Sequence, residues 1–68
     1  MTKFDGAKMK ETRLARKLSA YSLATAIGVH PNTILNWEAG RGEPGVGEVY
    51  KIAEALCIEF IELLSEQA

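Results

Sequence analysis

The 68 residues include eight basic and nine acidic side chains, for a formal net charge of −1, and 47% of the residues are hydrophobic. A chain of this length can build one small core, because a domain of about 60 residues buries only about 60% of the surface that it exposes when unfolded. One histidine and one cysteine cannot supply a zinc cluster, or a catalytic Cys/His pair with an orienting third group. We therefore expect a binding domain without metal or cofactor, and not an enzyme.

The ends of the chain and its cysteine favour a cytoplasmic protein. No apolar segment follows Met1, and the lone Cys57 cannot form an intrachain disulfide. The uncharged stretch 18–37 has about the length of a membrane span. It is interleaved with polar residues and broken by Gly-Val-His-Pro, so we expect no membrane association.

Capping residues predict three helices in the first part of the chain. Asp5 is a good N-cap for a first helix that extends through Lys17. Ser19 is the cap of a second helix, which Gly28 ends. His30 occupies the next cap position, and a third helix runs from Pro31 to the Ala-Gly pair at 39–40.

Apolar periodicity predicts two more helices after the glycine-rich loop that contains Pro44. Their apolar residues are Val46, Val49, Ile52, Ala53 and Leu56 in the fourth helix and Phe60, Leu63 and Leu64 in a brief fifth. Cys57, between them, is expected to be a small core filler. No segment alternates apolar and polar residues as a strand would. The predicted fold class is all-α: one compact five-helix domain over residues 1–68.

Residues 19–38 have the pattern of a helix-turn-helix motif. Two helices that cross at a steep angle need a small residue where their backbones approach and a residue tolerant of positive φ at the corner. Ala24 and Gly28 meet these needs. The apolar residues that would fill the wedge between the helices are Leu23, Ile27, Val29, Ile34 and Trp37.

The charged residues are divided unevenly along the chain. Residues 1–37 contain six basic and two acidic side chains, whereas residues 38–68 contain two basic and seven acidic ones. Such an asymmetry can turn one end of a domain toward a polyanion. It is equally compatible with two solvated sets of helix faces.

The segment from Lys8 to Leu64 resembles the Cro and phage-repressor type (XRE-like) helix-turn-helix family. Arg13 and Glu38 match a pair that forms an internal salt bridge in this family, and residues 38–44 resemble its loop after the third helix. The resemblance implies a lambda-repressor-like DNA-binding fold. It also implies a transcriptional regulator, here a repressor of phage or mobile-element type, acting as a dimer on a two-fold-related site in double-stranded DNA.

In that family the third helix lies in the major groove. The base-contacting positions that the resemblance implies are Pro31, Asn32, Thr33, Leu35 and Asn36. Asn32 and Asn36 are four residues apart, hence on one helix face, and an asparagine can pair with the N6 and N7 atoms of adenine. Thr33 and Leu35 could meet thymine methyl groups. The alternative is that these are ordinary exposed residues.

Phosphate contacts are expected from the start of the second helix and from nearby side chains. Ser19 would cap the helix while the amides of Ala20, Tyr21 and Ser22 remain free for a phosphate. The side chains expected to assist are Arg41, Lys17 and His30. Ala20 stands where the family often has glutamine, and the side chain of Pro31 cannot donate a hydrogen bond, so we expect few base contacts per half-site.

Two further expectations concern partners. Ile58 and Ile61 are three residues apart and form a second apolar stripe, which predicts a weak homodimer interface. The low overall charge keeps open an alternative function, a helix-turn-helix that binds protein, such as an antitoxin or an inhibitor of another regulator. With one small domain, no small-molecule ligand is expected.

Overall fold

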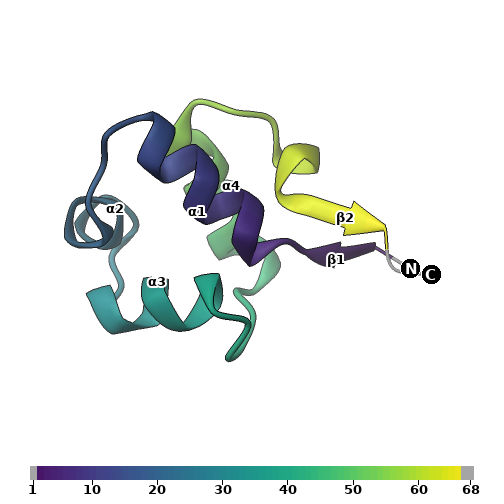
Figure 1. The fold of residues 1–68 in the computed structure, drawn as a ribbon, viewed down its shortest axis with the longest axis horizontal. Coiled ribbons are helices and arrows are strands. Elements are labelled where there is room, and N and C mark those ends of the chain that lie inside the picture. The colour runs from purple at the N-terminus through teal and green to yellow at the C-terminus, as the bar shows by residue number, and fades with distance from the viewer. Residues whose placement is uncertain (1, 67–68) are drawn as a thin grey trace.

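The computed structural model describes residues 2–66, which form four α-helices around one core and a two-stranded ribbon beside them (Figure 1). The helices are α1 (Gly6–Ala15), α2 (Ala20–Ile27), α3 (Pro31–Glu38), α4 (Val46–Leu56) and a short 3-10 helix, η1 (Phe60–Leu63). The strands are β1 (Thr2–Phe4) and β2 (Leu64–Glu66). Helix α2 packs against α3 and α4, and α3 packs against α1, so both helices of the motif contact the rest of the domain.

Side-chain caps start α1, α2 and α3 at the predicted residues. Asp5 accepts from the amide of Lys8, Ser19 from that of Ser22 and His30 from that of Asn32, each at 3.0 Å. Gly28 ends α2 with φ 79°, a left-handed conformation that glycine adopts without steric cost. The helix starts, and the turn of the motif, are therefore fixed by local sequence.

The core consists of the apolar faces of the four α-helices and one residue of η1. Its buried members are Met9, Leu23, Ala24, Ile27, Ile34, Val49, Ile52, Ala53, Leu56 and Leu63. Val29 and Trp37 are half-buried and pack against this core. The predicted wedge residues of the motif are thus all in or against the core.

The prediction of an all-α, five-helix domain is wrong in two respects. The expected fifth helix is the four-residue η1, and Leu64 begins a strand instead of continuing a helix. Strand β2 pairs antiparallel with β1, with Phe4 opposite Leu64, and the amide of Asp5 donates to the carbonyl of Leu63 at 2.7 Å. This pairing gives the backbone groups of the two short strands hydrogen-bond partners.

The structure also differs from two local predictions, the end of the first helix and the burial of Cys57. Helix α1 ends at Ala15 and not at Lys17, because Lys17 turns to φ 59° and the amide of Leu18 donates back to the carbonyl of Arg13 at 3.1 Å. Cys57 is exposed and not a core filler, since it ends α4 in a left-handed conformation with φ 57°. Among residues 2–66, no helix is both long and apolar enough to cross a bilayer.

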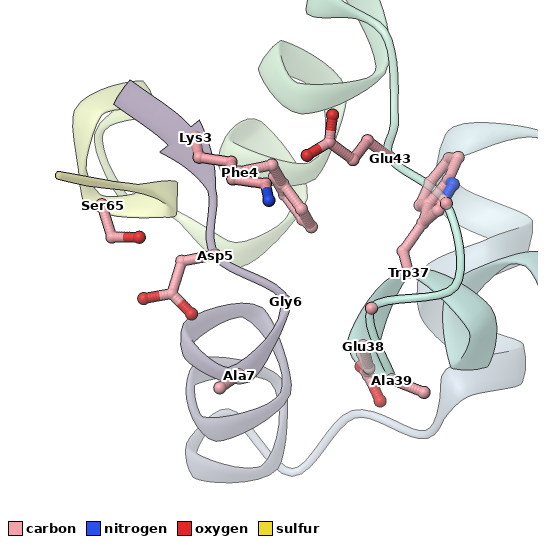
Figure 2. Close-up of a pocket in the computed structure, with 12 residues that line it drawn as sticks. Lys3, Phe4, Asp5, Gly6, Ala7, Trp37, Glu38, Ala39, Glu43 and Ser65 are labelled. Atoms are coloured by element: carbon pink, nitrogen blue, oxygen red, sulfur yellow. The ribbon is translucent and has the colours of Figure 1, made fainter. Parts of the chain in front are cut away.

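The start of α1 lies directly against the end of α3. A Cβ atom on Gly6 would overlap the carbonyl oxygen of Trp37 and would come within 3.1 Å of the Cα atom of Glu38. Figure 2 shows Gly6, Trp37 and Glu38 among the residues that line one hollow in the surface. The backbones of the two helices can approach this closely only because residue 6 has no side chain.

Candidate nucleic-acid interface

A buried ion pair attaches α3 to α1. The guanidinium of Arg13 donates from Nε to Oε2 of Glu38 at 2.7 Å and from Nη2 to Oε1 at 3.1 Å. Its remaining nitrogen, Nη1, donates to the carbonyl of Leu18 at 2.8 Å. The side chains of Arg13 and Glu38 are only 8% and 4% exposed. The pair is present at the two positions that the family resemblance indicated, and it also holds the turn between α1 and α2.

The same contacts explain the protonation of this site. The hydrogen bond to Glu38 raises the pKa of Arg13 above its already high ordinary value, although burial acts in the opposite direction. A raised arginine pKa gives a stabilising contribution that is lost only when strong alkali deprotonates the guanidinium. Arg13 therefore stays charged, and α3 stays attached, throughout the physiological pH range.

Helix α3 presents one face outward and is anchored by the opposite face. Ile34 is fully buried, whereas Asn32 is exposed and Leu35 is 46% exposed. The other predicted base-contacting residues are half-buried: Pro31, Thr33 and Asn36. All five residues belong to α3, and the two that are exposed, Asn32 and Leu35, lie near its beginning and its middle.

The start of α2 offers fewer free amides than predicted. The hydroxyl of Ser19 accepts from the amide of Ser22, and it donates to the Ser22 hydroxyl at 3.0 Å. Because the Ser22 amide is occupied, only the amides of Ala20 and Tyr21 remain for a phosphate. Ala20 is half-buried against the core, and Tyr21 is 69% exposed.

Two residues predicted to contact phosphate, His30 and Lys17, lie next to the starts of α3 and α2. The Nδ1 atom of His30 accepts from the amide of Asn32, which places the ring proton on Nε2 and leaves that atom able to donate. Lys17 is exposed in the turn that precedes α2. His30 thus lies at the start of α3, and Lys17 lies two residues before Ser19, the cap of α2.

Arg41 is joined to α3 by contacts that the sequence analysis did not predict. Its amide donates to the Asn36 carbonyl at 2.8 Å, and its Nε donates to Oδ1 of Asn36 at 3.2 Å. The first bond belongs to the helix-ending pattern in which Gly40, with φ 80°, turns the chain back over α3. The Ala-Gly pair at 39–40 was a sequence signal for this turn, and therefore for the nearness of Arg41 to Asn36.

The predicted apolar stripe for dimerisation is only half accessible. Ile58 is half-buried and packs against the core, so it is less available to a second chain than the predicted stripe requires. Ile61 is 66% exposed. A nearby apolar side chain that the sequence analysis did not single out is Tyr50, which is 58% exposed and stacks on Phe60 with ring centroids 4.3 Å apart.

The hollow in Figure 2 is separate from the residues that were predicted to contact DNA. It is lined at the carboxyl end of α3 and includes side chains of both signs, Lys3, Asp5 and Glu43. None of the predicted DNA contacts lines it. A site of mixed charge at that end of the helix does not suit a polyanion.

The sequence model of the helix-turn-helix family matches residues 9–63. The chain belongs to the helix-turn-helix family. The match covers the four α-helices from Met9 onward and η1, and the resemblance inferred from the sequence is confirmed.

Similar proteins extend this result. The helix-turn-helix chain is 33% identical over 60 residues to the cryptic phage CTXphi transcriptional repressor RstR of Vibrio cholerae, which covers 88% of this chain and 54% of the repressor. The chain thus spans about half the length of that relative. The restriction-modification controller protein C.AhdI from Aeromonas hydrophila has a similar structure, with a TM-score of 0.82, 33% identity and coverage of 85% of this chain and 88% of its own.

Hydroxypropylphosphonic acid epoxidase from S. wedmorenis also contains a similar structure, with a TM-score of 0.81 and 28% identity. The likeness covers 88% of this chain but only 32% of the epoxidase. It therefore concerns one part of that enzyme. Taken together, the family, the phage repressor and the controller protein support a DNA-binding transcriptional regulator.

Proposed function

We propose that this helix-turn-helix protein is a cytoplasmic, sequence-specific regulator of transcription, a repressor of phage or mobile-element type without enzymatic activity. Helix α3 would enter the major groove of double-stranded DNA and read base edges. The observation that carries the proposal is the attachment of α3 by the buried Arg13–Glu38 pair, with Asn32 and Leu35 left accessible on its outer face. A helix held in place on one side, with a polar and an apolar side chain accessible on the other, suits contacts with base edges and thymine methyl groups.

Phosphate contacts would position this helix. The amides of Ala20 and Tyr21 at the start of α2, together with Arg41 and Lys17, supply donors on the elements that flank α3. Phosphate contacts fix orientation, whereas base contacts give specificity. Selection of binding sites from randomised duplex DNA tests the proposal, and an enriched sequence with two-fold symmetry is the expected result.

Asn32→Ala should weaken binding to the selected site by about 1–3 kcal/mol, because it removes a donor and an acceptor that face the base edge. Binding to random duplex DNA and the dependence of affinity on salt should stay unchanged, since a neutral side chain releases no counterion. Titrations at several salt concentrations measure both quantities. Equal affinity of the variant and the parent for the selected site would exclude Asn32 as a reading residue.

The two-fold site requires two copies of the chain, and we propose a weak homodimer that uses the exposed apolar surface around Ile61 and Tyr50. Phe60, on which Tyr50 stacks, connects these residues to the core. The small number of exposed apolar side chains there implies a weak interface, which DNA binding would stabilise.

Ile61→Glu should leave the monomer folded, because this side chain is 66% exposed, and should lower affinity for the full two-fold site but not for a half-site. Leu14→Glu is the matched control, since Leu14 is 55% exposed on α1 and should change neither affinity. Analytical ultracentrifugation of the free and DNA-bound chain gives the stoichiometry. A parent chain that stays monomeric on a full site would contradict the dimer.

One observation favours a second candidate function, a helix-turn-helix that binds protein as an antitoxin or an inhibitor does. Residues 18–37, which form most of the proposed DNA face, carry no formal charge. The absence of retention on immobilised DNA at low salt, together with no enriched sequence, would favour this candidate over the repressor.

A further inference from the structure

Arg41 contacts Asn36 twice, once through the backbone and once through the side chain. The backbone contact is the 2.8 Å bond from the Arg41 amide to the Asn36 carbonyl, which closes the end of α3. The side-chain contact is the 3.2 Å bond from Nε of Arg41 to Oδ1 of Asn36. The first contact fixes where the Arg41 side chain begins, and the second brings it along the outer face of α3.

The side-chain contact determines what Asn36 can offer to a ligand. An unrestrained carboxamide can rotate to exchange its oxygen and nitrogen, because the last torsion of asparagine has broad, nearly two-fold preferences. A charged donor on Oδ1 selects one of the two orientations and makes Nδ2 the group left to donate. Asn36 is therefore oriented before any ligand binds, which reduces the entropy lost on binding.

We propose that Arg41 is a positioning residue for Asn36, and that the oriented Nδ2 group donates to N7 of a purine in the major groove. This inference rests on the proposed function. Atom N7 is an acceptor in both adenine and guanine, whereas the pyrimidine edges lack it. Because Arg41 uses Nε for this purpose, Nη1 and Nη2 at its tip are left to neutralise a phosphate, so one side chain serves base readout and backbone binding together.

Two neutral variants separate these roles. In Arg41→Gln, the Nε2 atom is the same number of bonds from the backbone as the Nε atom of arginine, so it can still donate to Oδ1 of Asn36. In Arg41→Met, a side chain of similar length has no donor. Both variants keep the backbone bond, and residue 41 is exposed, so both should melt at the temperature of the parent.

The two variants should behave alike toward phosphate and differently toward the base. Each should lower the magnitude of the salt slope by about one unit relative to the parent. A base contact discriminates by about 1–3 kcal/mol, which is about 5- to 150-fold in affinity. We expect Arg41→Gln to keep the parent's preference for a purine over a pyrimidine within about threefold, and Arg41→Met to lose about tenfold of it. Replacing that purine by its 7-deaza analogue should remove the difference between the variants.

Equal discrimination by Arg41→Gln and Arg41→Met would overturn the inference. So would a difference between the two that persists when Asn36 is replaced by alanine, because the donor would then act on another group. The same three-variant comparison, with Asn36→Ala as the background, forms a double-mutant cycle.

A measurement on the free protein separates this inference from the proposed function. The NMR signals of the Asn36 carboxamide should shift in Arg41→Met and stay near their parent positions in Arg41→Gln, while those of Asn32 stay unchanged in both. If these shifts are observed but selection enriches no DNA sequence, the proposed repressor function is rejected while the contact between Arg41 and Asn36 is supported. Unchanged Asn36 signals in Arg41→Met would reject the contact whatever the DNA experiments give.

Discussion

We expect Arg13→Met to lower the free energy of unfolding by about 3–5 kcal/mol, because it leaves the Glu38 carboxylate buried without its partner. A domain of this length has roughly 3–10 kcal/mol of stability in total. The variant should therefore be largely unfolded or melt far below the parent. Urea unfolding followed by far-UV circular dichroism measures the loss.

The double variant Arg13→Met with Glu38→Leu should recover much of this stability, since no charge is then stranded. Recovery should be incomplete, because the Leu18 carbonyl still loses the donor that Nη1 of Arg13 provides. The control is Glu11→Gln, which breaks the exposed Lys8–Glu11 pair at 3.8 Å and should cost less than about 1 kcal/mol. Losses that simply add in the double variant would mean that Arg13 and Glu38 are not coupled.

Gly6→Ala is the second change expected to have a large effect. The new Cβ atom would overlap the Trp37 carbonyl oxygen and approach the backbone of Glu38 to 3.1–3.2 Å. These are backbone atoms, so no rotamer change can relieve the overlap, and α1 must move away from α3. We expect a cost at or above the upper end of the usual overpacking range of about 1–3 kcal/mol, measured as a fall in the thermal midpoint.

Gly47→Ala is the matched control for this change. Gly47 also lies in the first turn of a helix, α4, but a Cβ atom there would meet nothing within 4 Å. Alanine should stabilise this position by about 0.4–1 kcal/mol through the lower entropy of the unfolded chain. A similar loss of stability in both variants would contradict the overlap with α3 as the cause, because a Cβ atom at position 47 meets nothing and alanine favours a helix more than glycine does.

The fold was predictable from sequence where single residues set local geometry. Asp5, Ser19 and His30 begin helices through their own side chains, and Gly28 ends one by its conformation. The ribbon was not predictable in this way. Its strands have three residues each, too few to show alternation, and they pair across almost the whole length of the chain. Periodicity at residues 60–64 also could not separate a 3-10 turn followed by a strand from an α-helix.

The candidate site was also predictable only in part. The family resemblance indicated the Arg13–Glu38 pair, because a motif carries paired positions even when they are 25 residues apart. The engagement of the Ser22 amide by Ser19 and the bond from Arg41 to Asn36 depend on where side-chain atoms lie after folding. The members of each pair are close in the sequence, but the sequence analysis gave Ser19 and Ser22, and Arg41 and Asn36, separate roles.

The ribbon of β1 and β2 brings the two ends of the described chain side by side, as Figure 1 shows. Because each strand has only the other as its hydrogen-bonded neighbour in the sheet, fraying of one strand releases the other. The two ends thus form a single cooperative opening unit, which should exchange its amide hydrogens together and faster than the core helices. A segment fused before β1 and a segment fused after β2 would leave the domain at the same corner, and either one could loosen the attachment of both.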